Sequence, residues 1–204
     1  MNVFVDGEFA FGVSLNTISK QGLYVGRTLS EEEFARVELA EGSDKALQAA
    51  YRLLEVRPRS VAEIRDRLRR KEFSPEQIEA TIERLTALDM LDDAAFARLW
   101  VENRQTLRPR GVSALRDELR RKGIDRAVAD TILSDEALTS EEGNRAMEIA
   151  RNALKKYATS PDRATFQRRL GGFLQRRGFG FDTIGPIVDT LWAELEAQRA
   201  SDAD

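Results

Sequence analysis

The sequence predicts an all-α protein of tandem three-helix repeats that form a curved, elongated array, preceded by a small N-terminal β-hairpin and helix module. The strongest observation is an internal repeat, because a basic helix, a short turn and an apolar residue occur twice at a spacing of 51 residues and again 55 residues later. The composition, with 33% charged and 7% aromatic residues, is typical of extended, well-solvated helical proteins. Apolar residues also keep a helical period from about residue 44 onward.

The first residues have a strand pattern instead of a helical one. Short runs rich in valine and phenylalanine flank Asp6-Gly7, a two-residue link that suits a primed hairpin turn. Residues 15–21 follow as one or two turns of helix, which Gly22 is expected to close. This segment therefore predicts a β-hairpin followed by a short helix.

Another helix of this module is expected to begin at Ser30. Glu33 stands three residues later, which is the spacing of a capping box. We expect this helix to end near Leu39, because the glycine-serine-aspartate run that begins at Gly42 marks a boundary. The module is therefore expected to occupy residues 1–42.

Beyond this boundary, helix follows helix with short links. We expect three repeats and an acidic tail, at residues 43–91, 92–137, 138–199 and 200–204. In the first repeat, Pro58 disfavours helical geometry at Arg57 and so ends the first helix, while Ser74-Pro75 is an N-cap with proline at the first helical position. Each unit of about 50 residues is too small to be secure alone, so neighbouring units are expected to stack.

The apolar positions with a helical period are the expected core. In chain order they are Ala46, Ala49, Ala50, Leu53, Leu54, Val61, Ile64, Leu68, Ile78, Ile82, Leu85, Phe96, Leu99, Trp100, Leu115, Leu119, Val128, Ile132, Leu133, Ala146, Ile149, Ala150, Leu154, Phe166, Leu170, Leu174, Ile184, Val188, Leu191 and Trp192.

Charge is distributed unevenly along a chain whose net charge is only -3. Residues 57–71 hold seven basic and two acidic side chains, residues 104–122 hold seven and two, and residues 155–177 hold seven and one. Acidic residues gather near the front, between the second and third repeats, and at the tail. Such a surface can dock in a groove made of protein and nucleic acid without binding every polyanion.

Cysteine and histidine are both absent. The chain therefore has no disulfide framework, no thiolate metal site, and neither the commonest general base nor the commonest metal ligand. No signal peptide or long apolar run is present, so we expect a cytoplasmic protein that makes no use of a membrane. The sequence predicts no enzyme activity, no cofactor and no metal, and we expect a monomer.

Three arginines at matching positions, Arg70, Arg121 and Arg176, are expected to form a solvent-facing row. On a helical wheel, Arg70 lies almost opposite the apolar face of its helix. Such a row suits a long polyanionic partner. The alternative is that each arginine only completes a surface ion pair of about 0.3 to 0.5 kcal/mol, since Asp66 and Asp117 stand four residues before Arg70 and Arg121.

The candidate nucleic-acid- or filament-binding residues are this row and other basic residues of the repeated segments. They are Arg57, Arg59, Arg69, Arg70, Lys71, Arg104, Arg108, Arg110, Arg120, Arg121, Lys122, Arg176 and Arg177. In the third repeat Gln175 replaces a flanking arginine, which thins the charge there.

Other conspicuous residues favour structural roles. Asp92-Asp93 stands directly before a helix and is interpreted as a cap rather than a metal pair. Phe96 and Trp100 lie four residues apart on one helix and are assigned to the core rather than to a base-stacking platform. The adjacent glycines at residues 171–172 indicate close packing against a neighbouring helix.

Residues 44–190 resemble the RecX regulatory proteins of bacteria in order and spacing. The resemblance rests on Asp92-Asp93-Ala94-Ala95-Phe96-Ala97-Arg98, Arg104, Arg108-Pro109-Arg110-Gly111, Leu119-Arg120-Arg121-Lys122-Gly123-Ile124-Asp125, Arg57-Pro58-Arg59-Ser60 with Glu63-Ile64 and Leu68, and Phe173-Leu174-Gln175-Arg176-Arg177-Gly178-Phe179. The N-terminal module is similar to the extension of the longer members. One departure is Glu72, which stands where the other two repeats carry glycine.

The resemblance implies a function as well as a fold. It implies that the chain binds the RecA recombinase, chiefly as a filament on single-stranded DNA, and inhibits its ATPase and strand-exchange activity, with a role in homologous recombination, DNA repair and the SOS response. It further implies that the chain lies in the helical groove of the filament and spans neighbouring subunits. Single-stranded DNA is the expected nucleic-acid partner, with weaker binding to double-stranded DNA.

Two other functions fit the residues. A three-helix unit can approximate a helix-turn-helix, so the chain could be a DNA-binding regulator that inserts one unit in the major groove. Against this alternative, the basic helices have few asparagine or glutamine residues to read adenine, and the cations repeat along the chain instead of gathering on one helix. The other function is a pure protein scaffold.

Overall fold

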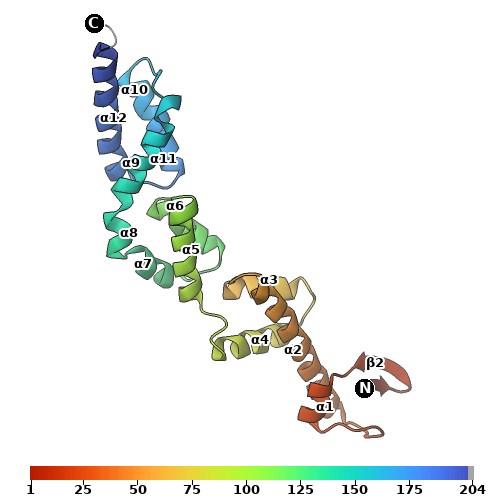
Figure 1. Ribbon diagram of the computed structural model, residues 1–204. Coiled ribbons are helices and arrows are strands. Elements are labelled where there is room, and N and C mark those ends of the chain that lie inside the picture. Colours follow the sequence, from red (N-terminus) through yellow and green to blue (C-terminus); the bar gives the residue numbers. More distant parts are fainter. Residues whose placement is uncertain (202–204) are drawn as a thin grey trace. The chain divides into compact units, whose positions relative to one another are not determined.

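A computed structural model describes residues 1–201, apart from the side chains of residues 136–137, as two compact units, Met1–Asp93 and the part from Ala94 onward (Figure 1). The first unit contains β1 (Asn2–Val5), β2 (Glu8–Gly12), α1 (Leu15–Gln21), α2 (Glu31–Val56), α3 (Val61–Arg69) and α4 (Pro75–Ala87). The second contains α5 (Asp93–Leu107, whose first residue still belongs to the first unit), α6 (Val112–Arg121), α7 (Arg126–Leu133), α8 (Glu136–Ser140), α9 (Glu142–Ala153), α10 (Arg163–Phe166), α11 (Gly172–Arg176) and α12 (Phe181–Ser201). The predicted fold class, helical repeats after a small β module, is confirmed.

The predicted hairpin is present. β1 and β2 pair antiparallel, with Val5 opposite Glu8 next to the turn. Asp6 and Gly7 have φ angles of 50° and 88°. Positive φ at both central residues is what a primed turn requires, and it matches the right-handed twist of the strands. The aspartate-glycine pair therefore determines the pairing next to the turn, and an irregularity between Val3 and Phe4 shifts the register beyond it.

Helix α1 is tied to α2 by a buried carboxylate. Ser14 caps α1, and Gly22 closes it in the left-handed conformation as predicted. Glu41 of α2 accepts hydrogen bonds from the Ser14 N–H and the Thr17 hydroxyl, both at 2.8 Å. Burial alone would raise the pKa of Glu41, but these bonds and Lys45 hold it below its usual value. The N-terminal module is thus anchored on α2.

The prediction that a helix ends near Leu39 is wrong. The capping box at Ser30 and Glu33 is present, but α2 continues for 26 residues to Val56. Gly42 lies inside this helix, where α2 packs against α4 and the end of the Gln77 side chain occupies the place of a Cβ. Close packing of two helices therefore outweighs the low helix propensity of glycine. The expected boundary at residue 42 falls within α2, and one helix serves both the module and repeat 1.

Repeat 1 packs α3 and α4 against the second half of α2. Ser60 and Ser74 cap α3 and α4, and Pro75 stands at the first turn of α4 as predicted. The core contains buried residues from all three helices: Ala46, Ala50, Ile64, Leu68, Ile78, Ile82, Leu85 and Leu91.

Repeat 2 has the same design. Its core contains Phe96, Ala97, Val101, Leu115, Leu119, Ile124, Ala129, Leu133 and Leu138. The ion pair between Arg65 and Glu79, at 2.8 Å, recurs 51 residues later between Arg116 and Asp130 at 2.9 Å. One predicted core residue is misplaced, because Leu99 is 40% exposed on the outer side of α5.

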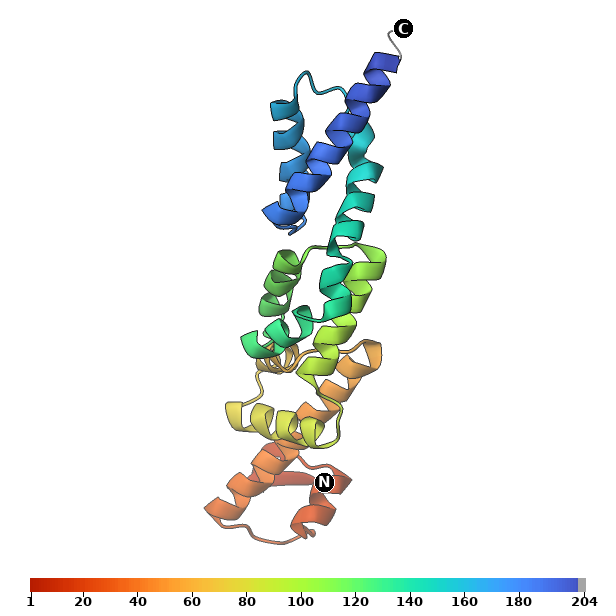
Figure 2. The same cartoon turned by 90° about the vertical axis from the view of Figure 1, so that its left-hand side faces the viewer.

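Repeat 3 packs α12 against α9 and against the helical stretch that contains α10 and α11, and Figure 2 shows α12 running beside this group. Between α10 and α11 the chain makes one π-helical turn, Gln167–Gly171. Gly171 is buried, and a Cβ there would come within 3.4 Å of Ile184 on α12, which agrees with the predicted close packing. The nearest atom to a Cβ at Gly172 belongs to Arg176 of its own helix.

Most of the predicted acidic tail, residues 202–204, lies outside the described residues. Within residues 1–201, no helix is sufficiently long and apolar to cross a membrane.

Candidate nucleic-acid interface

The three basic helices end in the same turn. In each repeat an N–H bonds back over five residues to a leucine carbonyl: Phe73 to Leu68 at 3.4 Å, Ile124 to Leu119 at 3.1 Å, and Phe179 to Leu174 at 3.3 Å. The residue before that N–H has positive φ, at Glu72 (64°), Gly123 (75°) and Gly178 (90°). The repeat read from the sequence is therefore a structural repeat, and the basic residues before each turn occupy equivalent positions.

The arginine row is exposed at all three positions, Arg70, Arg121 and Arg176. Arg70 makes the expected surface pair with Asp66 at 3.0 Å. In repeat 2 the expected pair is wrong, because Asp117 pairs with Arg120 at 3.1 Å instead of with Arg121. Residues three and four apart are both within reach on a helix, so sequence spacing alone did not decide between them.

This outcome leaves part of the row without acidic partners. Among the side chains that the structure describes, Arg121 and Arg176 make no ion pair, and Arg69 and Lys71 beside Arg70 make none either. Surface ion pairs contribute only about 0 to 1 kcal/mol, so even Arg70 can exchange Asp66 for a phosphate at little cost. The surface-pair alternative therefore explains one arginine of the row.

Two predicted site residues of repeat 1 have structural partners. Arg57 makes two hydrogen bonds with the Glu63 carboxylate, at 2.9 and 3.0 Å. Arg59 donates from Nε to the Leu53 carbonyl at 3.0 Å. That carbonyl lies in the last turn of α2, where cations are favoured. These two arginines fix the link between α2 and α3.

In repeat 2, the predicted binding residues Arg104 and Arg110 and the predicted core residue Trp100 converge on one carboxylate, that of Glu118 on α6. Arg104 Nε lies 2.6 Å and Arg110 Nε 3.9 Å from its oxygens, and Trp100 Nε1 donates to it at 2.9 Å. Arg104 and Lys122 each stand 4.6 Å from the centre of the Trp100 ring. We call these five residues the Trp100 cluster.

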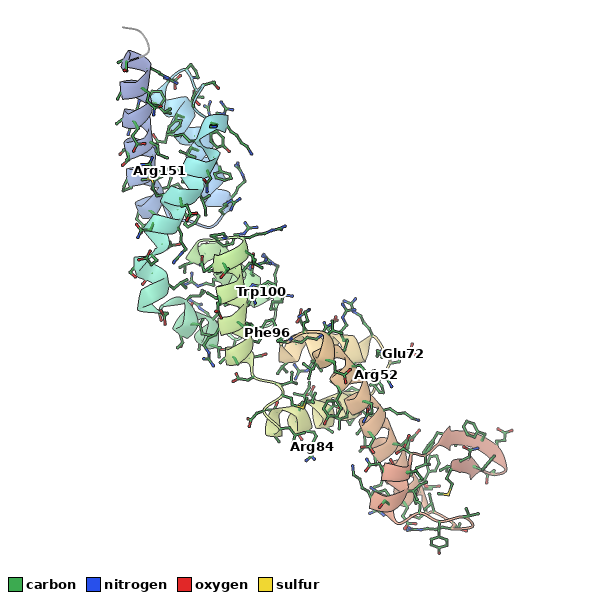
Figure 3. The ribbon with its side chains drawn as sticks, viewed as in Figure 1. Arg52, Glu72, Arg84, Phe96, Trp100 and Arg151 are labelled. Carbon is green, nitrogen blue, oxygen red and sulfur yellow. The ribbon has the colours of Figure 1, made fainter. Side chains whose placement is uncertain are left out.

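Trp100 is half-buried, because one part of its ring packs on the core and the rest contacts the charged residues of the Trp100 cluster. Its ring stacks on Phe96, one turn earlier on α5 (Figure 3), with centroids 6.0 Å apart. Cations gather at its ring, so it orients Arg104 and Lys122 and is not a bare platform for a base. The sequence assignment of Phe96 to the core is confirmed, whereas the roles of Trp100 and Glu118 were missed. The signal was the spacing of four between Trp100 and Arg104 and between Glu118 and Lys122.

Repeat 3 has its own aromatic and cationic pairs. Arg177 lies over Phe173 at 5.1 Å and Arg169 over Tyr157 at 5.6 Å. The two rings are 5.9 Å apart, so the four side chains form a continuous group. Arg177 occupies the register of Lys122, and both cations are thus supported by an aromatic ring.

A backbone contact brings the predicted cations of repeats 2 and 3 together. The Gly111 N–H donates to the Arg177 carbonyl at 3.0 Å, and a Cβ at Gly111 would come within 2.6 Å of the Phe179 nitrogen. The segment of Arg108 and Arg110 therefore lies directly against the turn that carries Arg176 and Arg177. Arg108 is exposed and makes no ion pair among the described residues. The contact thus places candidate cations of repeats 2 and 3 on adjoining segments of the backbone.

Carboxylates at the starts of α5 and α9 accept hydrogen bonds from the first turns of the basic helices α3 and α6. The Val61 N–H at the start of α3 donates to Asp93, and the Val112 N–H at the start of α6 donates to Glu142, each at 2.9 Å. Burial raises the pKa of Asp93, and the hydrogen bond from Val61 opposes this rise. Asp93 thus acts as a cap, as the sequence suggested for this aspartate pair, but the helix that it caps here is α3, whereas the prediction was for the helix that it begins.

The comparisons with known proteins agree with this architecture. Family models of the first, second and third three-helix domains of RecX match residues 46–85, 92–133 and 140–187. "Regulatory protein RecX" of Bacillus subtilis strain 168 is 32% identical over 206 residues, which covers 99% of this chain and 76% of the relative. "Regulatory protein RecX" of Lactobacillus delbrueckii subsp. bulgaricus is 38% identical over 141 residues, or 69% of this chain and 51% of the relative. The chain thus spans about half the length of such Lactobacillus relatives.

Two solved structures are similar. A crystal structure of regulatory protein RecX has a TM-score of 0.76 over 92% of both chains, at 24% identity, which supports the fold. The crystal structure of RecX from Lactobacillus salivarius has a TM-score of 0.64 and 25% identity over 78% of this chain and 99% of that one.

Proposed function

The chain belongs to the RecX family of regulatory proteins, and we propose that it binds the RecA recombinase and its filament on single-stranded DNA and inhibits the ATPase and strand-exchange activity of that filament. Through this inhibition it would modulate recombinational DNA repair. The partner comes from the resemblance, and the residues below are those that we assign to the contact.

The observation that carries the proposal is the placement of candidate cations of repeats 2 and 3 on adjoining segments of the backbone. Arg108 and Arg110 approach the turn of Arg176 and Arg177 through the Gly111 contact, and Arg121 stands exposed at the end of α6. Phosphate oxygens are the ligands that such arginines bind best, with fork-like hydrogen bonds. A strand of DNA could therefore meet several arginines in succession.

The acidic residues explain why the partner would be a filament rather than bare DNA. The net charge of -3 opposes adsorption to an unshielded polyanion. In a filament groove, DNA phosphate lies next to protein, so cations and acidic residues both find partners. Linking three modest contacts in one chain raises affinity through effective concentration.

We also propose that the chain is not an enzyme. It lacks histidine and cysteine, and its paired acids and bases form ion pairs that hold helices together. The purified chain is expected to show no nuclease, ATPase or ligase activity.

Co-sedimentation tests the proposal. We expect the chain to sediment with recombinase filaments on single-stranded DNA at lower concentrations than with naked DNA or with free recombinase. Equal binding to naked DNA would show that the chain does not recognise the filament as such and would contradict the proposed partner. Preference for one duplex sequence would favour the helix-turn-helix regulator instead.

A further inference from the structure

A cleft with a volume of about 860 Å³ lies between the N-terminal module and repeat 1. Its walls come from α1, α2, α4 and the turn after α3, all within the first compact unit. The volume is within the range of pockets that enclose a ligand. The anchoring of α1 on Glu41 of α2 fixes one wall relative to the others.

The cleft has an excess of positive charge. It is lined by five cationic residues and two acidic ones, and Lys20 and Lys45 pair with Asp44 and Glu41. The remaining three cations are Arg52 of α2, Lys71 of the turn and Arg84 of α4, of which Figure 3 marks the two arginines. None of these three makes an ion pair within residues 1–201. Stability gives no reason to place three unneutralised cations around one cleft.

Aromatic rings line the same cleft. Tyr51 and Phe73 are half-buried there, next in sequence to Arg52 and two residues after Lys71. Lys71 stands at the register of Lys122, whose partner in the Trp100 cluster is also a ring. Repeat 1 thus combines cations and aromatic surface as the later repeats do, but around a concave site.

We propose that this cleft binds a segment of single-stranded nucleic acid, with Arg52, Lys71 and Arg84 on its phosphates and Tyr51 and Phe73 against a base. Cations that follow a backbone and rings that accept any base are the means by which single strands are held without sequence preference. Tyr51 and Phe73 pack on the repeat 1 core with part of each side chain and stay partly exposed, and an acidic peptide would use the cations but not this exposed aromatic surface. The assignment deepens the proposed function, on which it rests for the origin of the strand, and brings the N-terminal module into the contact.

The test uses the full chain without recombinase. A fluorescent oligothymidylate is titrated at several salt concentrations against the wild type and against the triple variant Arg52→Gln, Lys71→Gln, Arg84→Gln. Single strands lose about 0.7 of log-log salt slope per phosphate contact, so we expect the slope to fall by about two and the affinity by about tenfold or more. Circular dichroism of both proteins checks that the fold is retained.

The matched control changes Arg36, Arg67 and Arg98 to Gln. These exposed arginines make no ion pair in residues 1–201 and do not line the cleft. The control loses the same number of charges, but none of them lies in the cleft. Its salt slope is therefore expected to remain near that of the wild type. Equal losses in the two triple variants would show a diffuse charge effect and overturn the proposal.

Photocrosslinking gives an independent readout. An oligonucleotide with 5-iododeoxyuridine is expected to crosslink to Tyr51 or Phe73, and a poly-glutamate competitor at equal charge is expected to leave the crosslink in place. Absence of binding by the wild type, absence of crosslinks in residues 51–84, or displacement by poly-glutamate would each overturn the cleft as a nucleic-acid site. Because recombinase is absent, these results are separate from the filament test, and either proposal can fail alone.

Discussion

The starts of α3 and α6 occupy the same register in repeats 1 and 2 but are completed in different ways. At α3, the buried Ser60 caps its own helix by accepting from the Glu63 N–H at 3.1 Å. At α6, Gly111 has no side chain to offer, and its own N–H donates to the Arg177 carbonyl of repeat 3. The first turn of α3 therefore has a side-chain cap from its own N-cap residue, whereas α6 lacks this cap and its N-cap residue contacts repeat 3 instead.

This difference has a consequence for the candidate interface. A serine at residue 111 would place a side chain where the turn of Gly178 approaches, so glycine is required for the two repeats to meet. The second compact unit contains both repeats 2 and 3, in agreement with this close contact. The contact that joins the repeats also places Arg108 and Arg110 beside Arg176 and Arg177.

The largest expected effect comes from Gly111→Ala. The new Cβ would overlap backbone atoms of Gly178 and Phe179, which cannot move aside as a flexible side chain could. We expect a loss of about 3 kcal/mol or more in the free energy of unfolding, measured by urea denaturation. Ser60→Ala, the matched change in repeat 1, removes the side-chain cap of α3 and should cost about 1 kcal/mol. Equal costs would show that the contact between repeats 2 and 3 is dispensable.

A smaller effect is expected at the turns after the basic helices. Glu72 has a φ of 64°, a conformation that costs a residue with a side chain about 1 kcal/mol or more relative to glycine. Glu72→Gly should therefore stabilise the chain by about 1 kcal/mol, and Gly123→Ala should destabilise it by a similar amount. Thermal unfolding measures both, and a destabilised Glu72→Gly would mean that the Glu72 side chain has a stabilising contact.

Asp93 predicts a pH dependence of the free energy of unfolding, whose sign follows from the burial of its carboxyl group. Because burial raises its pKa in the folded state, its contribution to stability is greatest below its unfolded pKa and is lost as the pH rises through the folded pKa. Asp93→Asn keeps an acceptor for the Val61 N–H but has no charge. Its stability relative to the wild type should therefore rise between about pH 3 and pH 7 in urea denaturation at each pH. If the stability of Asp93→Asn relative to the wild type falls over this range, the pKa of Asp93 is lowered in the folded state and the prediction is wrong.

The smallest effect on folding is expected for Arg70→Ala, Arg121→Ala and Arg176→Ala together. These exposed residues should change the free energy of unfolding by less than about 0.5 kcal/mol each. Filament binding should nevertheless weaken, with the log-log salt slope reduced by about 0.7 to 0.9 per lost phosphate contact. The Arg36, Arg67 and Arg98 variant is the control, and an unchanged slope in the row variant would restore the surface-pair interpretation.

Local signals in the sequence predicted local structure well. The aspartate-glycine hairpin, the serine caps and the repeated turns were all predicted, because each depends on residues fewer than six positions apart. The end of α2 was missed because the packing of Gly42 on Gln77 involves residues 35 positions apart. Propensity describes an isolated helix and does not include such a neighbour.

The candidate site was predicted as a set of cations but not as an arrangement. Their identity followed from the repeat, and exposure of the row followed from the helical wheel. The convergence of Trp100, Arg104 and Arg110 on Glu118 joins α5, α6 and the link between them, which a periodicity cannot reveal. A substitution within the repeat, Gly111 for Ser60, was the one sequence sign of the contact between repeats 2 and 3.

Recombinase ATP turnover on single-stranded DNA tests the central proposal most directly. The full chain is added at substoichiometric ratios to preformed filaments, with the Arg70, Arg121 and Arg176 variant in parallel. We predict that the wild type reduces ATP turnover by a larger fraction than the fraction of recombinase subunits that it could occupy one to one. The variant is expected to need a higher concentration for the same reduction. Turnover that stays at the rate of the untreated filament, even with the chain in excess, would contradict the account.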